Sequence, residues 1–142
     1  MAAPFRIRVA AGVLEDATGR VLVSRRPAGK HAAGAWEFPG GKLQPGESAL
    51  QALARELDEE LGIRLQAAEP LIDYTHRYPD RTVELQVFRV RRYAGRPRGR
   101  EGQPLRWLAP EALLPAGLLP ADEPILRALA LSRSADRSPR SP

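Results

Sequence analysis

The sequence predicts an α+β domain, an α/β/α sandwich in which a mixed β-sheet is packed between helices. Strand patterns come first along the chain, followed by a helix, further strands and a last helix, an order typical of mixed layers around one core. The length of 142 residues indicates a single domain. No apolar run approaches the ~18 residues of a membrane span. With no cysteine, the chain has neither disulfides nor thiolate metal ligands.

Three strands are predicted in the N-terminal third. In residues 5–14, apolar side chains first alternate with arginines and then run together, which indicates a half-buried strand. The turn-like residues 16–20 lead to residues 21–24, which we expect to be its hairpin partner. After an irregular loop, a short strand over 36–38 is expected to stop at the Pro-Gly-Gly that follows.

The best-defined helix is predicted between Ser48 and Gly62. Ser48 lies three residues before Gln51, which is a capping-box signature, and Gly62 is a typical C-terminal stop. Between these signals leucines recur at helical spacing. They predict one buried stripe, made of Leu50, Leu53, Leu57 and Leu61.

The C-terminal half is predicted to add strands and a second helix. Strands are expected near residues 71–77, 82–91 and 105–108, and a Pro-broken segment over 110–120 follows them. A last helix is expected over about Glu123–Leu131, with Asp122 as its natural N-cap. The Pro- and Ser-rich residues 133–142 are predicted to be a disordered basic tail, which leaves residues 1–132 as the domain.

The chain is basic, with 22 basic residues against 17 acidic ones and a net charge of +5. Seven arginines fall between Arg89 and Arg106, where Glu101 is the only acidic residue. Such a segment can be a solvated hairpin surface, or it can bind nucleic acid or a phosphate-bearing small ligand. The charge alone does not choose between these interpretations.

The predicted helix over 48–62 carries an unusual acidic face. Glu56, Glu59 and Glu60 lie within about one third of its circumference, and within the predicted helix no Lys or Arg follows any of them four residues later. Glu59 and Glu60 also fall in the last turn, where the helix dipole disfavours negative charge. A solvated acidic face is the plain interpretation. Three carboxylates at this spacing also suit Mg²⁺ or Mn²⁺, which prefer hard oxygen ligands.

The residues around these glutamates resemble the Nudix box. The pattern G-x5-E-x7-R-E-U-x-E-E-x-G-U, where U is aliphatic, is matched without exception by Gly41, Glu47, Arg55, Glu56, Leu57, Glu59, Glu60, Gly62 and Ile63. The resemblance implies the Nudix fold and a hydrolase that cleaves a nucleoside diphosphate linked to another moiety. It also implies Mg²⁺ as cofactor, with Mn²⁺ as an alternative.

The resemblance to the Nudix box further assigns roles to individual residues. It implies that Glu56, Glu59 and Glu60 are metal ligands, and that Glu56 by preference helps to deprotonate the attacking water. Arg55 would orient the carboxylates through an ion pair, with Glu47 supporting them from behind. The carbonyl of Gly40 would add one further metal ligand.

Stretches outside the box resemble the MutT branch of the family, and together they span residues 5–131. They are SRRPAGKHAAGAWEFPGGKL, YPDR, REGQPLRWL and LPADEPIL. This likeness implies hydrolysis of 8-oxo-dGTP to the monophosphate and pyrophosphate, which removes an oxidised precursor before a DNA polymerase inserts it. It implies Glu101 as a further metal ligand and nucleotide contacts from Arg26, His31, Phe38, Arg81 and Asp122. Each of these residues also has a plain alternative role. Glu101 would only offset its arginine neighbours. The others would be a surface charge (Arg26), a loop residue (His31), a core residue (Phe38), a turn cap (Arg81) and a helix N-cap (Asp122).

Asp122 departs from the MutT pattern, which has Asn in PANEP where this chain has PADEP. Asn can donate and accept, so it can pair with the carbonyl and the N7–H of an oxidised guanine, whereas an ionised Asp only accepts. A protonated Asp122 could still serve the oxidised purine if a dry pocket raised its pKa. An ionised Asp122 would suit the exocyclic amine of cytosine or adenine. The motif PAD-x-P also resembles the corresponding motif of Nudix enzymes that act on cytidine nucleotides.

We therefore expect a Mg²⁺-dependent nucleoside triphosphate pyrophosphohydrolase, with 8-oxo-dGTP as the favoured substrate. A CTP, dCTP or modified-dCTP pyrophosphohydrolase is the enzymatic alternative. A catalytically silent Nudix module that only binds nucleotides is the alternative of another class. We expect a cytoplasmic monomer that binds a nucleoside triphosphate and forms no stable complex with nucleic acid or membrane.

Overall fold

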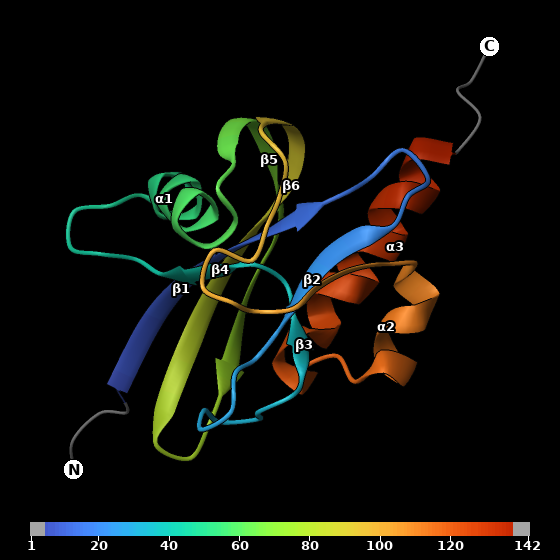
Figure 1. Ribbon diagram of the computed structural model, residues 1–142. Helices are drawn as coiled ribbons and strands as arrows, with labels where there is room; N and C mark the ends of the chain where they lie inside the picture. Colours follow the sequence, from blue (N-terminus) through green and yellow to red (C-terminus); the bar gives the residue numbers. More distant parts are fainter. Residues whose placement is uncertain (1–4, 138–142) are drawn as a thin grey trace.

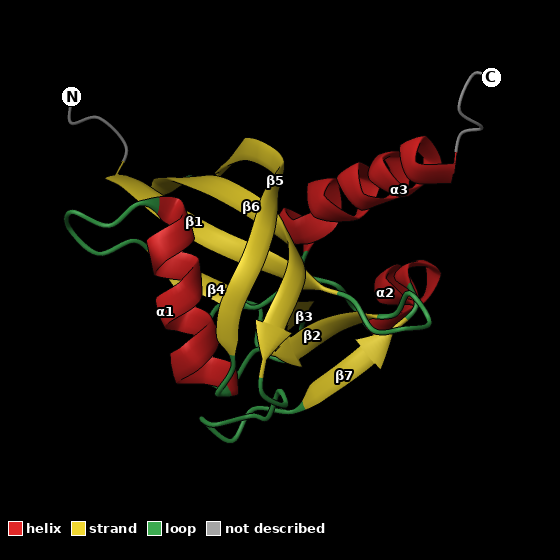
Figure 2. Ribbon diagram, turned by 90° about the horizontal axis from the view of Figure 1, so that it is seen from above, coloured by secondary structure: helices red, strands yellow, loops and turns green. Residues whose placement is uncertain are grey.

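The computed structural model describes residues 5–137 as two β-sheets held between helices, which confirms the α+β sandwich (Figures 1 and 2). The four-stranded sheet has the order β4-β1-β6-β5, and its strands are β1 (Phe5–Leu14), β4 (Gly40–Lys42), β5 (Arg64–Arg77) and β6 (Arg81–Ala94). The three-stranded sheet has the order β3-β2-β7, with β2 (Val21–Arg25), β3 (Trp36–Glu37) and β7 (Leu105–Leu108).

The helices lie on opposite sides of this pair of sheets. Helix α1 (Ala49–Leu61) covers one side, and α2 (Pro110–Ala116) and α3 (Glu123–Arg137) lie on the other, as Figure 2 shows. A 3₁₀ turn, η1 (Pro120–Asp122), leads directly into α3. None of the helices in the described part of the chain is both long enough and apolar enough to span a bilayer.

The predicted hairpin between residues 5–14 and 21–24 is wrong. Strand β1 pairs in parallel with β6 and antiparallel with β4, whereas β2 pairs with β3 and β7 in the other sheet. The reason is the apolar run at the end of β1, which is buried on both faces. Ala10 and Leu14 pack under α1, and Ala11 and Val13 pack into a second core with α2 and α3. A strand covered on both faces is a central strand of a layered fold.

Helix α1 begins and ends as its sequence predicts. The Ser48 hydroxyl accepts a hydrogen bond from the Gln51 amide and the Gln51 side chain returns one to the Ser48 amide, while Gly62 adopts a left-handed φ of 69°. The predicted leucine stripe is wrong at Leu50, which is 44% exposed. Ala49 and Ala52 take its place beside the three buried leucines, Leu53, Leu57 and Leu61.

Two short elements escaped prediction, and the last helix is longer than predicted. Strand β4 falls in the Pro-Gly-Gly region where we expected a stop, and α2 occupies the segment that its prolines suggested would be broken. Helix α3 continues to Arg137, so the prediction of disorder from residue 133 is wrong for residues 133–137. The remainder of the predicted tail, 138–142, lies outside the described residues.

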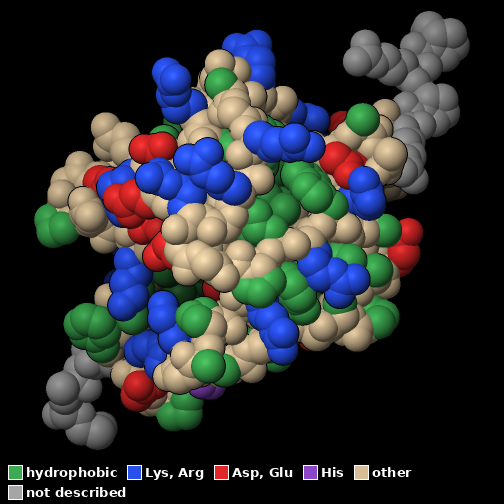
Figure 3. Space-filling view, viewed as in Figure 1, with side chains coloured by type: hydrophobic (Ala, Val, Ile, Leu, Met, Phe, Trp, Pro, Cys, Tyr) green, Lys and Arg blue, Asp and Glu red, His purple; other side chains and the backbone are tan. Residues whose placement is uncertain are grey.

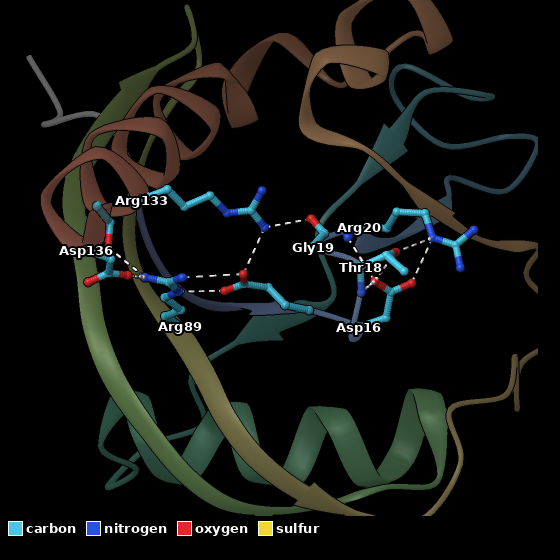
Figure 4. Close-up of polar contacts among 9 residues, drawn as sticks. Asp16, Thr18, Gly19, Arg20, Arg89, Arg133 and Asp136 are labelled. Atoms are coloured by element: carbon cyan, nitrogen blue, oxygen red, sulfur yellow. Dashed lines mark hydrogen bonds and ion pairs between the residues drawn. The ribbon is translucent and has the colours of Figure 1, made fainter. Parts of the chain in front are cut away.

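A buried arginine explains why α3 continues. The guanidinium of Arg89 on β6 donates to Glu15 at the end of β1 and, at 2.9 Å, to Asp136 on α3 (Figure 4). Arg133 of α3 donates to the same Glu15 at 2.8 Å and to the carbonyl of Gly19 at 2.7 Å. The Arg89 side chain is only 6% exposed, so the network fastens the last turns of α3 to the four-stranded sheet and to the turn that follows β1.

We expect Arg89→Met to lower the free energy of unfolding by about 3 kcal/mol, because it leaves the partly buried Glu15 with one cation fewer. The matched control is Arg91→Met. Arg91 pairs with Glu69 on the surface, where the two side chains are 45% and 49% exposed, so its loss should cost less than about 1 kcal/mol. Urea unfolding of both variants measures the difference. Equal losses would show that the Arg89 network does not hold α3 in place.

Candidate active site

Helix α1 presents the three glutamates that the sequence singled out. Its buried leucines fix the rotation of the helix against β1, so Glu56, Glu59 and Glu60 point away from that core. Figure 3 shows a group of acidic side chains over α1, beside a group of basic ones. Because the cap at Ser48 and the stop at Gly62 define the ends of the helix, local sequence sets where each carboxylate lies.

Arg55 joins the carboxylates into one network, as the sequence predicts. Its Nε and Nη2 donate to the two oxygens of Glu47 at 2.8 and 2.9 Å, and its Nη1 donates to Glu56 at 2.9 Å and to Glu59 at 3.3 Å. Nη2 also donates to the carbonyl of Lys42 at 3.0 Å. The hydrogen bonds with Glu47 raise the pKa of Arg55 above its ordinary value. Arg55 is therefore a fixed cation behind the acidic face of α1.

Glu60 lies in a crowded acidic environment. Burial raises the pKa of Glu60 well above its ordinary value, and the charges of Glu56 and Glu101 raise it further, against a hydrogen bond from the Gly40 amide. The backbone also comes close here, because a Cβ placed on Gly41 would lie 2.4 Å from the carboxyl carbon of Glu56. Only glycine at position 41 leaves that carboxylate its place.

A cleft of about 930 Å³ collects the predicted site residues. Its walls include Glu56, Glu59, Glu60, Glu101 and Gly40 from the proposed metal set, together with Arg26, His31, Phe38, Arg81 and Asp122 from the proposed nucleotide set. Arg55 stands behind the wall rather than in it. A second cavity, of about 740 Å³, shares Arg26, Phe38, Gly40, Glu60 and Glu101 with the first. The two hollows therefore meet at the carboxylates.

Asp122 forms the buried end of the cleft. It is 6% exposed, and its Oδ2 accepts a hydrogen bond of 3.0 Å from the Phe38 amide. Burial is the main cause that raises the pKa of Asp122 to about 7, and nearby Glu37 adds to the shift, while the Phe38 amide and Arg26 oppose it. Asp122 lies in η1, and its carboxylate accepts this hydrogen bond from Phe38, the residue that follows β3. The predicted N-cap is therefore wrong: within residues 5–137 the Asp122 side chain accepts from Phe38 rather than from an amide of α3.

The other predicted nucleotide contacts line the same cleft. Arg26 donates to Glu37 at 2.7 Å and to the carbonyl of His31 at 2.8 Å, so it braces the loop between β2 and β3. Phe38 is 4% exposed and belongs to the core, yet it also lines the cleft. The guanidinium of Arg81 lies 4.2 Å from the ring centre of Tyr78.

Among the residues that line this cleft, sequence reasoning did not single out His76, Tyr78 and Glu37. The rings of His31 and His76 meet the ring of Tyr78 edge-on, at 5.6 and 4.6 Å between centres, and Glu37 pairs with Arg26. His76 and Tyr78 lie on either side of Arg77 at the end of β5, and the period-2 spacing of a strand could have placed both rings on one face. No sequence pattern pointed to Glu37, because its ion-pair partner, Arg26, lies at the other end of the loop between β2 and β3.

The fit of these residues to a metal ion rests on their oxygen chemistry. The charges of Glu56 and Glu101 raise the proton affinity of Glu60, and a divalent cation can relieve the same repulsion between carboxylates as a proton does. As they stand, no three acidic or histidine side chains among residues 5–137 are grouped closely enough to hold a metal ion. The donor set therefore fits Mg²⁺ in kind, and ion binding would have to draw the carboxylates together.

The NUDIX domain model matches residues 10–128, so the chain belongs to the Nudix family and is a hydrolase of that family. Over 124 residues it is 36% identical to the 8-oxo-dGTP diphosphatase of Escherichia coli K12, covering 87% of this chain and 96% of that enzyme. It is 40% identical over 129 residues to the CTP pyrophosphohydrolase of the same organism, covering 91% and 95%.

Solved structures place the chain within the MutT-like branch of the family. The solution structure of the E. coli ORF135 protein superposes with a TM-score of 0.83 at 38% identity, covering 96% of both chains. A MutT structure from work on Aliivibrio salmonicida and Vibrio cholerae gives a TM-score of 0.76 at 31% identity, covering 89% of this chain and 98% of that one. Both the expected Nudix fold and the MutT-like resemblance are thus confirmed.

Proposed function

We propose that this protein is a Mg²⁺-dependent nucleoside triphosphate pyrophosphohydrolase that converts 8-oxo-dGTP to 8-oxo-dGMP and pyrophosphate. One observation carries this proposal: a single cleft joins the acidic face of α1 and Glu101 to a buried polar residue, Asp122. The acidic end suits the hydrolysis of a phosphate anhydride, and the buried end suits the reading of a base. Similarity to the E. coli 8-oxo-dGTP diphosphatase supports the substrate.

At the acidic end we assign the metal ligands to the carboxylates of Glu56, Glu59, Glu60 and Glu101 and the carbonyl of Gly40. When bound, Mg²⁺, or Mn²⁺ in its place, would neutralise charge on the phosphate oxygens and lower the pKa of water. Glu56 is the preferred acceptor of the water proton. Its carboxylate is held between Arg55 and Gly41, so its oxygens keep a fixed direction. Arg55 would also hold Glu59 toward the cleft.

At the other end we assign the nucleotide contacts to Arg26, His31, Phe38, Arg81 and Asp122. With a pKa of about 7, Asp122 is protonated in a large share of molecules at neutral pH. A protonated carboxyl resembles the Asn side chain in having one donor and one acceptor, so it can donate to the base carbonyl and accept from the N7–H of 8-oxoguanine. The Phe38 amide fixes the carboxyl group for this contact.

A second candidate substrate is a cytosine nucleotide: CTP, dCTP or a modified dCTP. The observation that favours it is the same Asp122, because its ionised form accepts from the exocyclic amine of cytosine and repels a guanine carbonyl. The 40% identity to the E. coli CTP pyrophosphohydrolase also supports it. Both candidates use the same acidic end of the cleft, so they differ only in the base.

The protein would work as a cytoplasmic monomer on the free nucleotide pool, with no stable complex with nucleic acid. A catalytically silent module that only recognises nucleotides is the alternative class. The intact acidic face of α1 argues against that alternative, because a pure binding module has no need of an acidic face that puts two glutamates in the last helical turn.

Product analysis tests the proposed reaction. We expect 8-oxo-dGTP to yield 8-oxo-dGMP and pyrophosphate when Mg²⁺ is present, and no products above background in EDTA. Ion-exchange chromatography of the nucleotides, with a coupled assay for pyrophosphate, identifies both products. Release of inorganic phosphate and a diphosphate would contradict the bond that we propose is cleaved. Nucleotide binding without any hydrolysis would favour the silent module.

A further inference from the structure

The loop between β6 and β7, residues 95–104, holds the C-terminal end of α1. Two of its backbone amides, those of Arg98 and Arg100, donate to the carbonyls of Leu61 and Glu60, both at 3.0 Å. In Figure 1 this loop runs past the end of α1 on its way to β7. The arginine-rich segment therefore packs on the helix that carries the site, rather than standing free as a solvated hairpin.

Two side chains of the same loop strengthen this contact. Nη1 of Arg100 donates to the Asp58 carbonyl at 2.9 Å, and Nε2 of Gln103 donates to the Glu60 carbonyl at 3.0 Å. The other end of the Gln103 amide, Oε1, accepts from the backbone amide of Glu101 at 2.9 Å. A single side chain thus ties the backbone of Glu60 to the backbone of Glu101.

The C-terminal end of α1 requires hydrogen-bond donors and positive charge that the helix itself does not supply. The last carbonyls of a helix lack intrahelical partners and carry partial negative charge. Helix α1 has no basic residue in its last turn, although Glu59 and Glu60 lie there. The loop supplies both the missing donors and the missing positive charge, because Arg100 bonds directly to one of these carbonyls.

The contacts also join the two parts of the acidic site. Glu60 lies on α1, Glu101 lies on the loop, and both line the two cavities. We propose that Gln103 and Arg100 are positioning residues that fix the last turn of α1 against Glu101, and so set the spacing of the carboxylates for a divalent cation. This inference rests on the proposed function, because it gives these carboxylates the role of metal ligands.

The test compares three substitutions in the full chain: Gln103→Met, Arg100→Met and Arg96→Met. Gln103→Met keeps the length of the side chain and removes both of its hydrogen bonds. Arg96 is the matched control for Arg100, since it is an exposed arginine of the same loop whose side chain makes no hydrogen bond or ion pair within residues 5–137. Both Arg variants lose one positive charge, so charge alone cannot distinguish them.

Binding of Mn²⁺ alone, followed by its electron paramagnetic resonance signal, is the primary measurement. We expect Gln103→Met and Arg100→Met to weaken Mn²⁺ binding about tenfold and to lower kcat by a similar factor, as loss of support for metal ligands does elsewhere. We expect KM for the nucleotide and the melting temperature to change little. Arg96→Met should match the wild type in all four measurements.

Two results would overturn the inference. One is Mn²⁺ affinity in Gln103→Met within twofold of the wild type, and the other is an equal loss in Arg96→Met and Arg100→Met. Failure of the proposed function would look different, because the wild-type chain would then hydrolyse no nucleoside triphosphate. The Mn²⁺ comparison would still decide whether the loop sets the spacing of the carboxylates.

Discussion

Replacing Glu56 with Gln should lower kcat for 8-oxo-dGTP by about 10³-fold, because the substitution removes a metal ligand and the preferred acceptor of the water proton. The fold should survive. Gln keeps the shape of Glu and can still contact the Arg55 guanidinium through its amide oxygen, where the native distance is 2.9 Å. Steady-state hydrolysis at saturating Mg²⁺, with circular dichroism to verify folding, measures both effects.

The matched control for Glu56→Gln is Glu111→Gln on α2. Glu111 is exposed and lies outside both cavities, so this change should leave kcat within about twofold of the wild type. If Glu56→Gln retains near-full turnover, the assignment of the metal ligands and of the proton acceptor to the face of α1 is wrong. A loss caused only by unfolding would show in the spectrum of the variant.

Replacing Asp122 with Asn should remove a pH dependence from both stability and activity. The folded-state pKa of about 7 lies above the ordinary value of 3.8, so the folded chain binds this proton more tightly than the unfolded chain. The resulting stabilisation is complete below about pH 4 and is lost as the pH rises through about 7. The loss is on the order of 4 kcal/mol. Asn cannot ionise and still accepts from the Phe38 amide.

We therefore expect Asp122→Asn to have little effect on the free energy of unfolding below about pH 4, and to increase it by about 1–2 kcal/mol at pH 5 and by about 4 kcal/mol at pH 8. For activity, kcat/KM of the wild type on 8-oxo-dGTP should fall as Asp122 ionises above about pH 7, whereas the Asn variant should hold its value to higher pH. Urea unfolding and initial rates at a series of pH values measure these effects. Parallel pH profiles for the two proteins would mean that Asp122 does not titrate in the base pocket.

Local signals explain which parts of the fold could be predicted from the sequence. Helix α1 was predicted almost completely, because Ser48, Gln51 and Gly62 determine its ends through contacts a few residues apart. The predicted leucine stripe is wrong only at Leu50, because Ala49 and Ala52 complete the buried face of α1 in its place. Apart from β4, α2 and η1, the order of strands and helices was also correct.

Non-local contacts explain the errors. The partners of β1 are β4 and β6, and each residue of β1 pairs with one 76 positions later in β6, so the hairpin with β2 was a natural but wrong choice. The disorder predicted from residue 133 ignored Arg89, whose pairing with Asp136 joins two segments that the sequence keeps far apart. The Nudix box located the carboxylates of the site. It gave no sign of Gln103, because the role of Gln103 depends on where the loop meets α1.

The most direct test of the proposed function compares kcat/KM for five nucleotides at pH 7 with Mg²⁺: 8-oxo-dGTP, dGTP, CTP, dCTP and 5-methyl-dCTP. We expect 8-oxo-dGTP to be preferred over each of the others by at least tenfold, because the protonated form of the buried Asp122 pairs with the oxidised purine. A preference for a cytosine nucleotide would contradict this substrate and make the ionised Asp122 the residue that selects the base.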